Sequence, residues 1–250
     1  MGLGPGSPEF LAPAAREAIA NAQVVVGYNG YIGLVDKRLL QGKEVISTGM
    51  RGEVERCLRA IERALMGLDT VIVSSGDPGI YGMAGLVLEL IEREGLQDLM
   101  EIEVIPGIPA LSAAAALLGA PLMHDFSVVS LSDLLTPWEL IIKRVRAALE
   151  ADFVLVIYNP RSRRRTWQLQ EVLKEVKKGK GSALPVGIVR NAAREGQKVA
   201  VVKAGDVDPD SIDMLTILII GNSQTRVVGS KMVTPRGYME KYQHKQGSLK

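Results

Sequence analysis

Residues 71–82 limit the possible folds of this chain more than any other stretch. They open with Val71, Ile72 and Val73, a β-branched run that is typical of a buried parallel strand. Small residues and Pro78 follow at once and predict a tight turn, and apolar residues at helical spacing resume at Met83. The turn therefore lies at the carboxyl end of a strand, where open α/β sheets place their ligands.

Strand-like and helix-like segments alternate along the rest of the chain. This alternation predicts an α/β fold, and we expect two α/β domains, with mainly parallel strands in the first sheet and a mixed second sheet. The domains are expected at residues 1–121 and 122–230, followed by a polar tail at 231–250. The expected strands cover residues 24–26, 44–46, 71–74, 103–105, 127–130, 153–158, 186–189, 199–202 and 215–220. The expected helices cover residues 13–22, 53–66, 83–94, 109–118, 137–150 and 166–177.

Two of the helix starts carry capping signals. Thr136 precedes Pro137, which fits a first helical turn, and Glu139 completes a capping box. Thr166 is expected to cap the helix that follows it.

Composition is that of an ordinary globular protein, with 47% hydrophobic and 23% charged residues among 250. The net charge of +2 gives no support to a nucleic-acid partner. The single cysteine, Cys57, excludes an internal disulfide framework and fits a reducing compartment, so we expect a cytoplasmic protein. No apolar run reaches the roughly 18–20 residues that span a membrane, and no signal-peptide pattern opens the chain, so we expect no membrane partner.

Metal and hydrolase chemistry receive little support from the sequence. His124 and His244 have no partner histidine or cysteine at a metal-ligand spacing, so we expect no protein-bound catalytic metal. His124 could act as a general base, although a solvated or hydrogen-bonded histidine is the simpler interpretation. The nucleophile elbow Gly-x-Ser-x-Gly of serine hydrolases is absent from the sequence.

The turn after residue 74 favours a positively charged ligand. Gly76 lets the backbone approach a ligand closely, and Asp77 adds a fixed negative charge. Such a site suits an ammonium or sulfonium group better than a phosphate.

Two further glycine and proline turns accompany it. The segment Gly2-Leu-Gly-Pro-Gly6 differs from the dinucleotide fingerprint in spacing, and Pro5 lacks a backbone donor that a phosphate cradle would use. A turn that only joins strand to helix remains an alternative for it. Residues 104–110 form a second strand-to-helix switch, which is ordinary punctuation alone but becomes the other side of a crevice next to Gly76.

Five motifs together resemble one family. Gly4-Pro5-Gly6, Ser75-Gly-Asp-Pro78 and residues 104–107 resemble the tetrapyrrole (corrin and porphyrin) methyltransferases, which use S-adenosylmethionine. Residues 130–138 and 158–163 resemble the precorrin-3B C-17-methyltransferase branch of cobalamin biosynthesis. The resemblance runs from about residue 2 to residue 238. It implies a cofactor site in a cleft between the two domains.

The resemblance also implies which residues form the site. The residues implied to bind S-adenosylmethionine are Pro5, Ser75, Gly76, Asp77, Ile80, Pro109, Ala110, Tyr158, Asn191, Ala192 and Thr216. Ser132, Arg161 and Arg163 are implied to bind a corrinoid substrate, since arginine binds carboxylates in a bidentate manner. The arginine run could instead be a solvated face. No catalytic residue is identified, because methyl transfer depends on alignment of the reactants more than on acid–base groups.

The sequence departs from the family pattern at three places. The strand that normally precedes Gly2 is reduced to Met1, which puts the first sheet in doubt. Ser7 replaces a frequent aspartate, and Pro109 replaces a serine or threonine, so a hydroxyl contact is lost there.

The resemblance implies methyl transfer to C-17 of a precorrin-3B-type macrocycle with ring contraction, by an enzyme that commonly forms homodimers. Three alternatives stay open. One is a sister enzyme that acts at another corrin carbon, and another is an RNA or protein methyltransferase on the same scaffold. The third is a non-catalytic module that binds S-adenosylmethionine.

Overall fold

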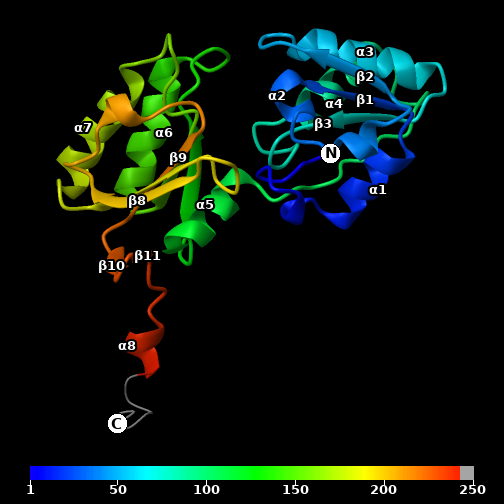
Figure 1. Ribbon diagram of the computed structural model, residues 1–250. Coiled ribbons are helices and arrows are strands. Elements are labelled where there is room, and N and C mark those ends of the chain that lie inside the picture. Colours follow the sequence, from blue (N-terminus) through cyan, green and yellow to red (C-terminus); the bar gives the residue numbers. More distant parts are fainter. Residues whose placement is uncertain (243–250) are drawn as a thin grey trace, which may run out of the picture. The chain divides into compact units, whose positions relative to one another are not determined.

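The computed structural model describes residues 1–242 (Figure 1). The chain divides into two compact units, Met1–Ala113 and Ala114–Lys250. The division falls inside helix α5 (Ala110–Leu118), earlier than the expected boundary at residue 121. Both units combine helices with a sheet, as predicted.

The sheet of the first unit is parallel and has the order β2-β1-β3. Val26 in β1 lies opposite Ile46 in β2 and Ile72 in β3. The strands are β1 (Val24–Tyr28), β2 (Glu44–Thr48) and β3 (Thr70–Val73). The helical segments are η1 (Pro8–Phe10), α1 (Pro13–Asn21), α2 (Asn29–Ile32), η2 (Lys37–Leu40), α3 (Glu53–Leu65) and α4 (Ala84–Arg93), and α5 begins at the end of this unit.

Helices cover both faces of this sheet, because successive side chains of a strand point to opposite faces. Val25 packs in one cluster with Ile19 of α1, whereas Val24 and Val26 pack with Ala60 of α3. The β-branched run of β1 is therefore buried on both sides, as the sequence of a parallel strand requires.

The strand predicted at residues 103–105 is wrong, because these residues form no regular strand. Met1–Leu3 lies next to β3 instead: Leu3 N donates to Ser74 O and Ser74 N donates to Met1 O. Gly2 N in turn donates to Ile105 O at 3.0 Å. The amino group of Met1 donates to Ile72 O, and burial lowers its pKa to about 6. Residues 103–105 thus lie beside the short segment Met1–Leu3, and not beside a regular strand with which they could form a sheet.

The main sheet of the second unit is mixed and has the order β5-β6-β9-β7-β8. Strands β5 and β6 run parallel, and the other neighbours run antiparallel. The strands are β5 (Phe126–Ser130), β6 (Val154–Tyr158), β7 (Pro185–Arg190), β8 (Lys198–Lys203) and β9 (Thr216–Ile220). Helices α6 (Trp138–Glu150) and α7 (Gln168–Lys180) and the short η3 (Pro209–Ser211) complete this part.

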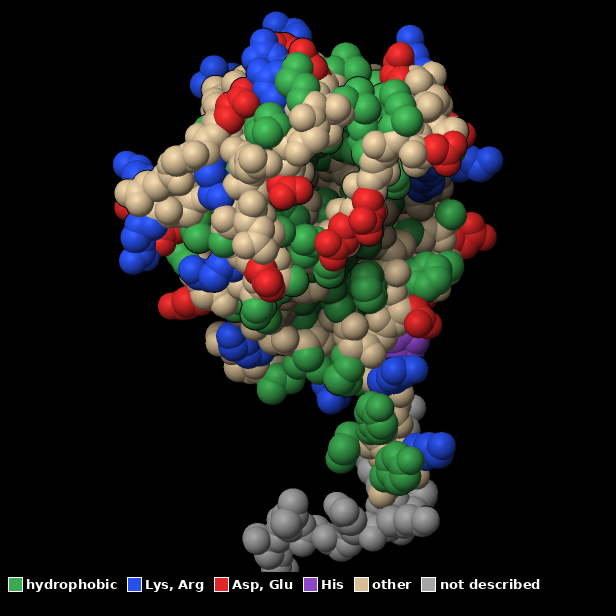
Figure 2. Space-filling view, turned by 90° about the vertical axis from the view of Figure 1, so that its right-hand side faces the viewer, with side chains coloured by type: hydrophobic (Ala, Val, Ile, Leu, Met, Phe, Trp, Pro, Cys, Tyr) green, Lys and Arg blue, Asp and Glu red, His purple; other side chains and the backbone are tan. Residues whose placement is uncertain are grey.

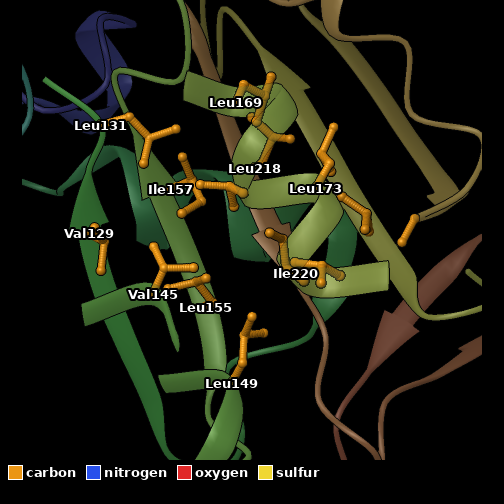
Figure 3. Packing of buried hydrophobic residues seen from close by; sticks show 14 of the residues in the cluster. Val129, Leu131, Val145, Leu149, Leu155, Ile157, Leu169, Leu173, Leu218 and Ile220 are labelled. Atoms are coloured by element: carbon orange, nitrogen blue, oxygen red, sulfur yellow. The ribbon is translucent and has the colours of Figure 1, made fainter. Parts of the chain in front are cut away.

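Helices α6 and α7 share one core with the sheet (Figure 3). Val145 and Leu149 from α6 point toward Leu155 of β6, and Leu169 and Leu173 come from α7. These side chains are fully or almost fully buried. The apolar stripes read from the sequence are therefore the buried faces of both helices.

Both predicted side-chain caps are wrong. Pro137 is the N-cap residue of α6 and Trp167 that of α7, and neither helix start has a side-chain cap. Thr136 and Thr166 each lie two residues before the first residue of the helix that they were expected to cap.

The polar tail begins later than predicted. Strand β11 (Lys231–Val233) pairs with β10 (Arg226–Val228) and with β4 (Gly119–Ala120), and Met232 is fully buried. Helix α8 (Tyr238–Tyr242) follows, and His244 lies outside the described residues. Among residues 1–242, no helix combines the length and apolar character needed to cross a membrane.

Candidate functional site: turns at the strand ends of both units

In the first unit, Asp77 holds two of the predicted turns together. Its Oδ1 accepts a hydrogen bond from Gly79 N at 2.8 Å, within its own turn. Its Oδ2 accepts from Gly107 N at 3.0 Å, in the turn before α5. Two carboxylate oxygens offer about four lone pairs, so Asp77 keeps acceptor capacity for a further donor. The charge of Asp77 also raises the pKa of the Met1 ammonium, although the effect of burial outweighs it.

The third turn joins them through its backbone. Gly4 N donates to Gly76 O at 3.2 Å, and Gly76 N donates to Gly4 O at 2.7 Å. The turns at Gly4, Gly76 and Gly107 thus meet at the carboxyl edge of the parallel sheet.

Glycine is required at this meeting point. A Cβ on Gly107 would lie 2.2 Å from Gly76 O, and a Cβ on Gly2 would lie 2.4 Å from the same atom. Gly76 itself has a φ of +66°, in the left-handed region that side chains disfavour. The surface that results is made largely of main-chain groups, which is the kind of wall that a ligand can approach closely.

The sequence-predicted residues of the first unit gather here. Gly76 lies against Pro109 and Ala110, since a Cβ on Gly76 would be 3.6 Å from atoms of both. Pro5 and Ser75 are the chain neighbours of Gly4 and Gly76. Ile80 N donates to Asp77 O at 3.4 Å in the same turn, and Ile80 is 36% exposed.

In the second unit, the loops after β5 and β6 are tied to each other. Ser130 Oγ accepts a hydrogen bond from Asn159 Nδ2 at 2.9 Å and one from Ser132 N at 3.2 Å. Leu131 N donates to Tyr158 O at 3.0 Å. Since β5 and β6 are parallel neighbours, Ser132 and Tyr158 lie at the same edge of the sheet.

The remaining predicted residues share that edge. Arg190 of β7 lies opposite Thr216 of β9, because these strands are antiparallel, so Asn191 and Ala192 follow directly beside Thr216. Asn191 N donates to Leu215 O at 3.0 Å. The edge therefore combines the carboxyl ends of β5, β6 and β7 with the amino end of β9.

The arginine run divides into different environments, which its sequence did not reveal. Arg161 makes an ion pair with Asp210, at 2.6 Å between Nη2 and Oδ1, and also donates to the Asp210 carbonyl. Arg163 and Arg164 are exposed. Arg161 therefore already has a carboxylate partner, and Arg163 is the freer surface cation of the two implied substrate ligands.

Arg165 is the buried residue of the run. It is 6% exposed, and burial lowers its pKa. Its Nη2 donates to Asn159 O at 2.6 Å and to Met214 Sδ at 3.3 Å. Arg165 thereby fixes the loop after β6 and connects it to the residues that precede β9. No signal in the run of arginines distinguishes it from its exposed neighbours.

The structure offers little to support metal binding. Within residues 1–242, no group of three or more histidine, cysteine, aspartate or glutamate side chains is placed to hold a metal ion. His124 is exposed, and its Nδ1 accepts a hydrogen bond from Asp125 N at 2.7 Å.

A pocket beside β3, lined by Met1, Ile72 and Ile102 among others, contains none of the residues implied to bind the cofactor.

Charge is mixed on the surface drawn in Figure 2. Basic and acidic side chains are interspersed there with hydrophobic ones, without a continuous positive field.

Comparison with known proteins decides the family. The family model of Tetrapyrrole (Corrin/Porphyrin) Methylases matches residues 1–208. The chain belongs to this family. It is a mixed α/β methyltransferase, as the sequence motifs implied.

Individual relatives agree over almost the whole length. The chain is 49% identical to a protein of Salmonella typhimurium named "Probable cobalt-factor III C(17)-methyltransferase", over 95% of this chain and 98% of that protein. The crystal structure of the methyltransferase CobJ is 38% identical, with a TM-score of 0.89, and the match covers 94% of this chain and 97% of that one. These similarities confirm the predicted branch of the family.

A third similar structure carries a bound ligand in its description. Uroporphyrin-III C-methyltransferase from Thermus thermophilus was solved in complex with S-adenosyl homocysteine. It is 26% identical to this chain, with a TM-score of 0.64, and the match covers 88% of this chain and 95% of that one.

Proposed function

We propose that this methyltransferase transfers a methyl group from S-adenosylmethionine to C-17 of a cobalt-factor III or precorrin-3B type macrocycle, with ring contraction, in cobalamin biosynthesis. The near full-length similarity to a relative with a C-17 name supports the choice of carbon. The observation that carries the proposal is the meeting of glycine turns around Asp77 at the end of a parallel sheet.

The residues present fit the cofactor. A wall of main-chain groups lets a flat, extended molecule lie close, and the carboxylate of Asp77 suits its sulfonium and ammonium groups. Ser75, Gly76, Asp77, Pro109 and Ala110 would hold it in the first unit, with Ile80 and Pro5 beside them. The family resemblance implies that Tyr158, Asn191, Ala192 and Thr216 also contact it.

Bound there, the cofactor supplies an electrophilic methyl group that needs no further activation. The residues of the chain then bind and orient the two reactants and exclude water, and alignment alone can account for roughly 7–11 kcal/mol of the barrier. We assign no side chain to the proton transfers of ring contraction.

The macrocycle is a polycarboxylate, which suits the arginine-bearing loop after β6. Arg163 is exposed and can reach a carboxylate, and Ser132 lies on the neighbouring loop. Arg161 would have to share its guanidinium with Asp210. We therefore assign Arg163 the larger part of the direct contact.

We further propose a cytoplasmic homodimer. The single cysteine is fully buried, which fits a reducing compartment but does not depend on one. Sedimentation of the purified protein at micromolar concentration tests the dimer directly, and a monomer would contradict it.

The activity is tested by mass spectrometry of a corrinoid after incubation with methyl-labelled S-adenosylmethionine. We expect a single labelled methyl group at C-17 and a contracted ring. A label at another carbon would indicate a sister enzyme. Binding of S-adenosylhomocysteine in calorimetry without turnover of any macrocycle would indicate a non-catalytic module.

A further inference from the structure

The loop between β5 and α6 exposes two leucines next to the arginine-bearing loop. Leu134 is 73% exposed and Leu135 is 98% exposed. Burial of a leucine removes apolar surface from water and is favourable, so a pair left in water is a hydrophobic surface that a ligand or partner could cover. We call residues 131–137 the leucine loop.

The first half of the leucine loop is held in place by burial and hydrogen bonds. Leu131 is fully buried in the core, and Ser132 N donates to Ser130 Oγ at 3.2 Å. Asp133 Oδ2 accepts a hydrogen bond from Gln168 Nε2 at 2.8 Å, and Gln168 is itself buried. The two leucines therefore follow directly after an anchored turn, so little ordering would be needed to use them for binding.

The other end of the loop rests on an aromatic pair. Trp138, the first residue of α6, packs edge to face against Trp167 at 4.9 Å between ring centroids. Trp167 lies two residues after Arg165, so this contact joins the leucine loop to the loop that carries Arg163.

A hydrophobic and a cationic surface thus adjoin at one sheet edge. A ligand that complements both has an apolar face and several negative charges on its rim. A membrane of anionic lipids also has this character. The family of the chain acts on tetrapyrroles, however, so we take a carboxylated macrocycle as the occupant.

We propose that Leu134 and Leu135 pack against the apolar face of the tetrapyrrole while the arginines of the neighbouring loop bind its carboxylates. This assignment rests on the proposed function, because it takes the macrocycle as substrate. It makes the leucine loop a determinant of substrate binding and gives it no part in binding the cofactor.

The test compares the double variant Leu134→Ser/Leu135→Ser with wild type. Cobyrinic acid, a corrin with free carboxylates, is titrated while the fluorescence of Trp138 and Trp167 is followed, because a bound macrocycle quenches it. We expect at least a tenfold weaker corrin affinity in the variant and unchanged affinity for S-adenosylhomocysteine in calorimetry. Leu99→Ser, which changes a 66% exposed leucine of the first unit, should leave both affinities unchanged.

A second variant separates chemistry from loop structure. Leu134→Met/Leu135→Met keeps an apolar surface and should bind the corrin nearly as wild type does. Wild-type corrin affinity in the serine variant would overturn the assignment. So would a shift of the serine variant from dimer to monomer, since a second copy would then cover the leucines. Failure of the wild type itself to bind any corrin would instead overturn the proposed function, and this assignment with it.

Discussion

Replacing Asp77 by alanine tests two roles of this carboxylate. One is to hold two turns together by accepting hydrogen bonds, and the other is to bind a cation. The side chain accepts hydrogen bonds from Gly79 N and Gly107 N, and the variant removes both. A hydrogen bond to a charged group contributes about 1.5–3 kcal/mol, with less for the exposed partner Gly79. We expect the free energy of unfolding to fall by about 2–3 kcal/mol.

For a protein of this size, such a loss lowers Tm by roughly 5–10 °C, which differential scanning calorimetry measures easily. The affinity for S-adenosylhomocysteine should fall roughly tenfold or more in calorimetry, because a charged contact is lost. Asp77→Asn keeps one oxygen acceptor and should lie between wild type and alanine in stability. It loses the charge, however, so its affinity should resemble that of the alanine variant.

Asp69→Ala provides the matched control, since it removes an exposed carboxylate just before β3. If Asp77→Ala unfolds like this control and binds with wild-type affinity, the carboxylate has neither role. A loss of stability with unchanged affinity would leave Asp77 only the role of holding the two turns together.

Three further predictions follow from the described contacts. Gly107→Ala should lower both Tm and cofactor affinity because its Cβ would overlap backbone, whereas Gly85→Ala meets no atom within 4 Å and should not lower affinity in calorimetry. Burial raises the pKa of the Cys57 thiol to about 11, so alkylation by iodoacetamide at pH 8, followed by mass spectrometry, should be far slower in native protein than in urea. Arg165→Ala should lower Tm in scanning calorimetry more than Arg164→Ala, because Arg165 is buried and donates to Asn159 O, whereas Arg164 is exposed.

The strands that the sequence predicted best are those buried on both faces. The expected strand at residues 24–26 became β1 (Val24–Tyr28), and that at 153–158 became β6 (Val154–Tyr158). Both are continuous apolar runs bounded by turn residues, so the strand follows from composition and length alone. The parallel first sheet could also be predicted, since each strand is separated from the next by a helix.

The strand predictions failed where strand formation depends on pairing with a segment that lies far away in the sequence. Residues 103–105 have a strand-like composition, yet Met1–Leu3 lies between them and the end of β3. Strands β10 and β11 were not predicted, because each has only three residues and gains its stability from the other. A local pattern does not contain the position of a partner that lies far away in the chain.

The same reasoning separates what could and could not be known about the site. That Gly76, Pro109 and Asn191 would follow strand ends was predictable, because the turn residues themselves mark the ends. Which side chain holds the turns together was not, since the partner of Asp77 lies 30 residues away at Gly107. Likewise, Arg161 and Arg165 look equivalent in sequence. Arg161, however, pairs with an aspartate 49 residues away, whereas Arg165 is buried and donates to the backbone of its own loop. A charge run therefore predicts that an anion could bind, and only the fold determines which of its cations remains available.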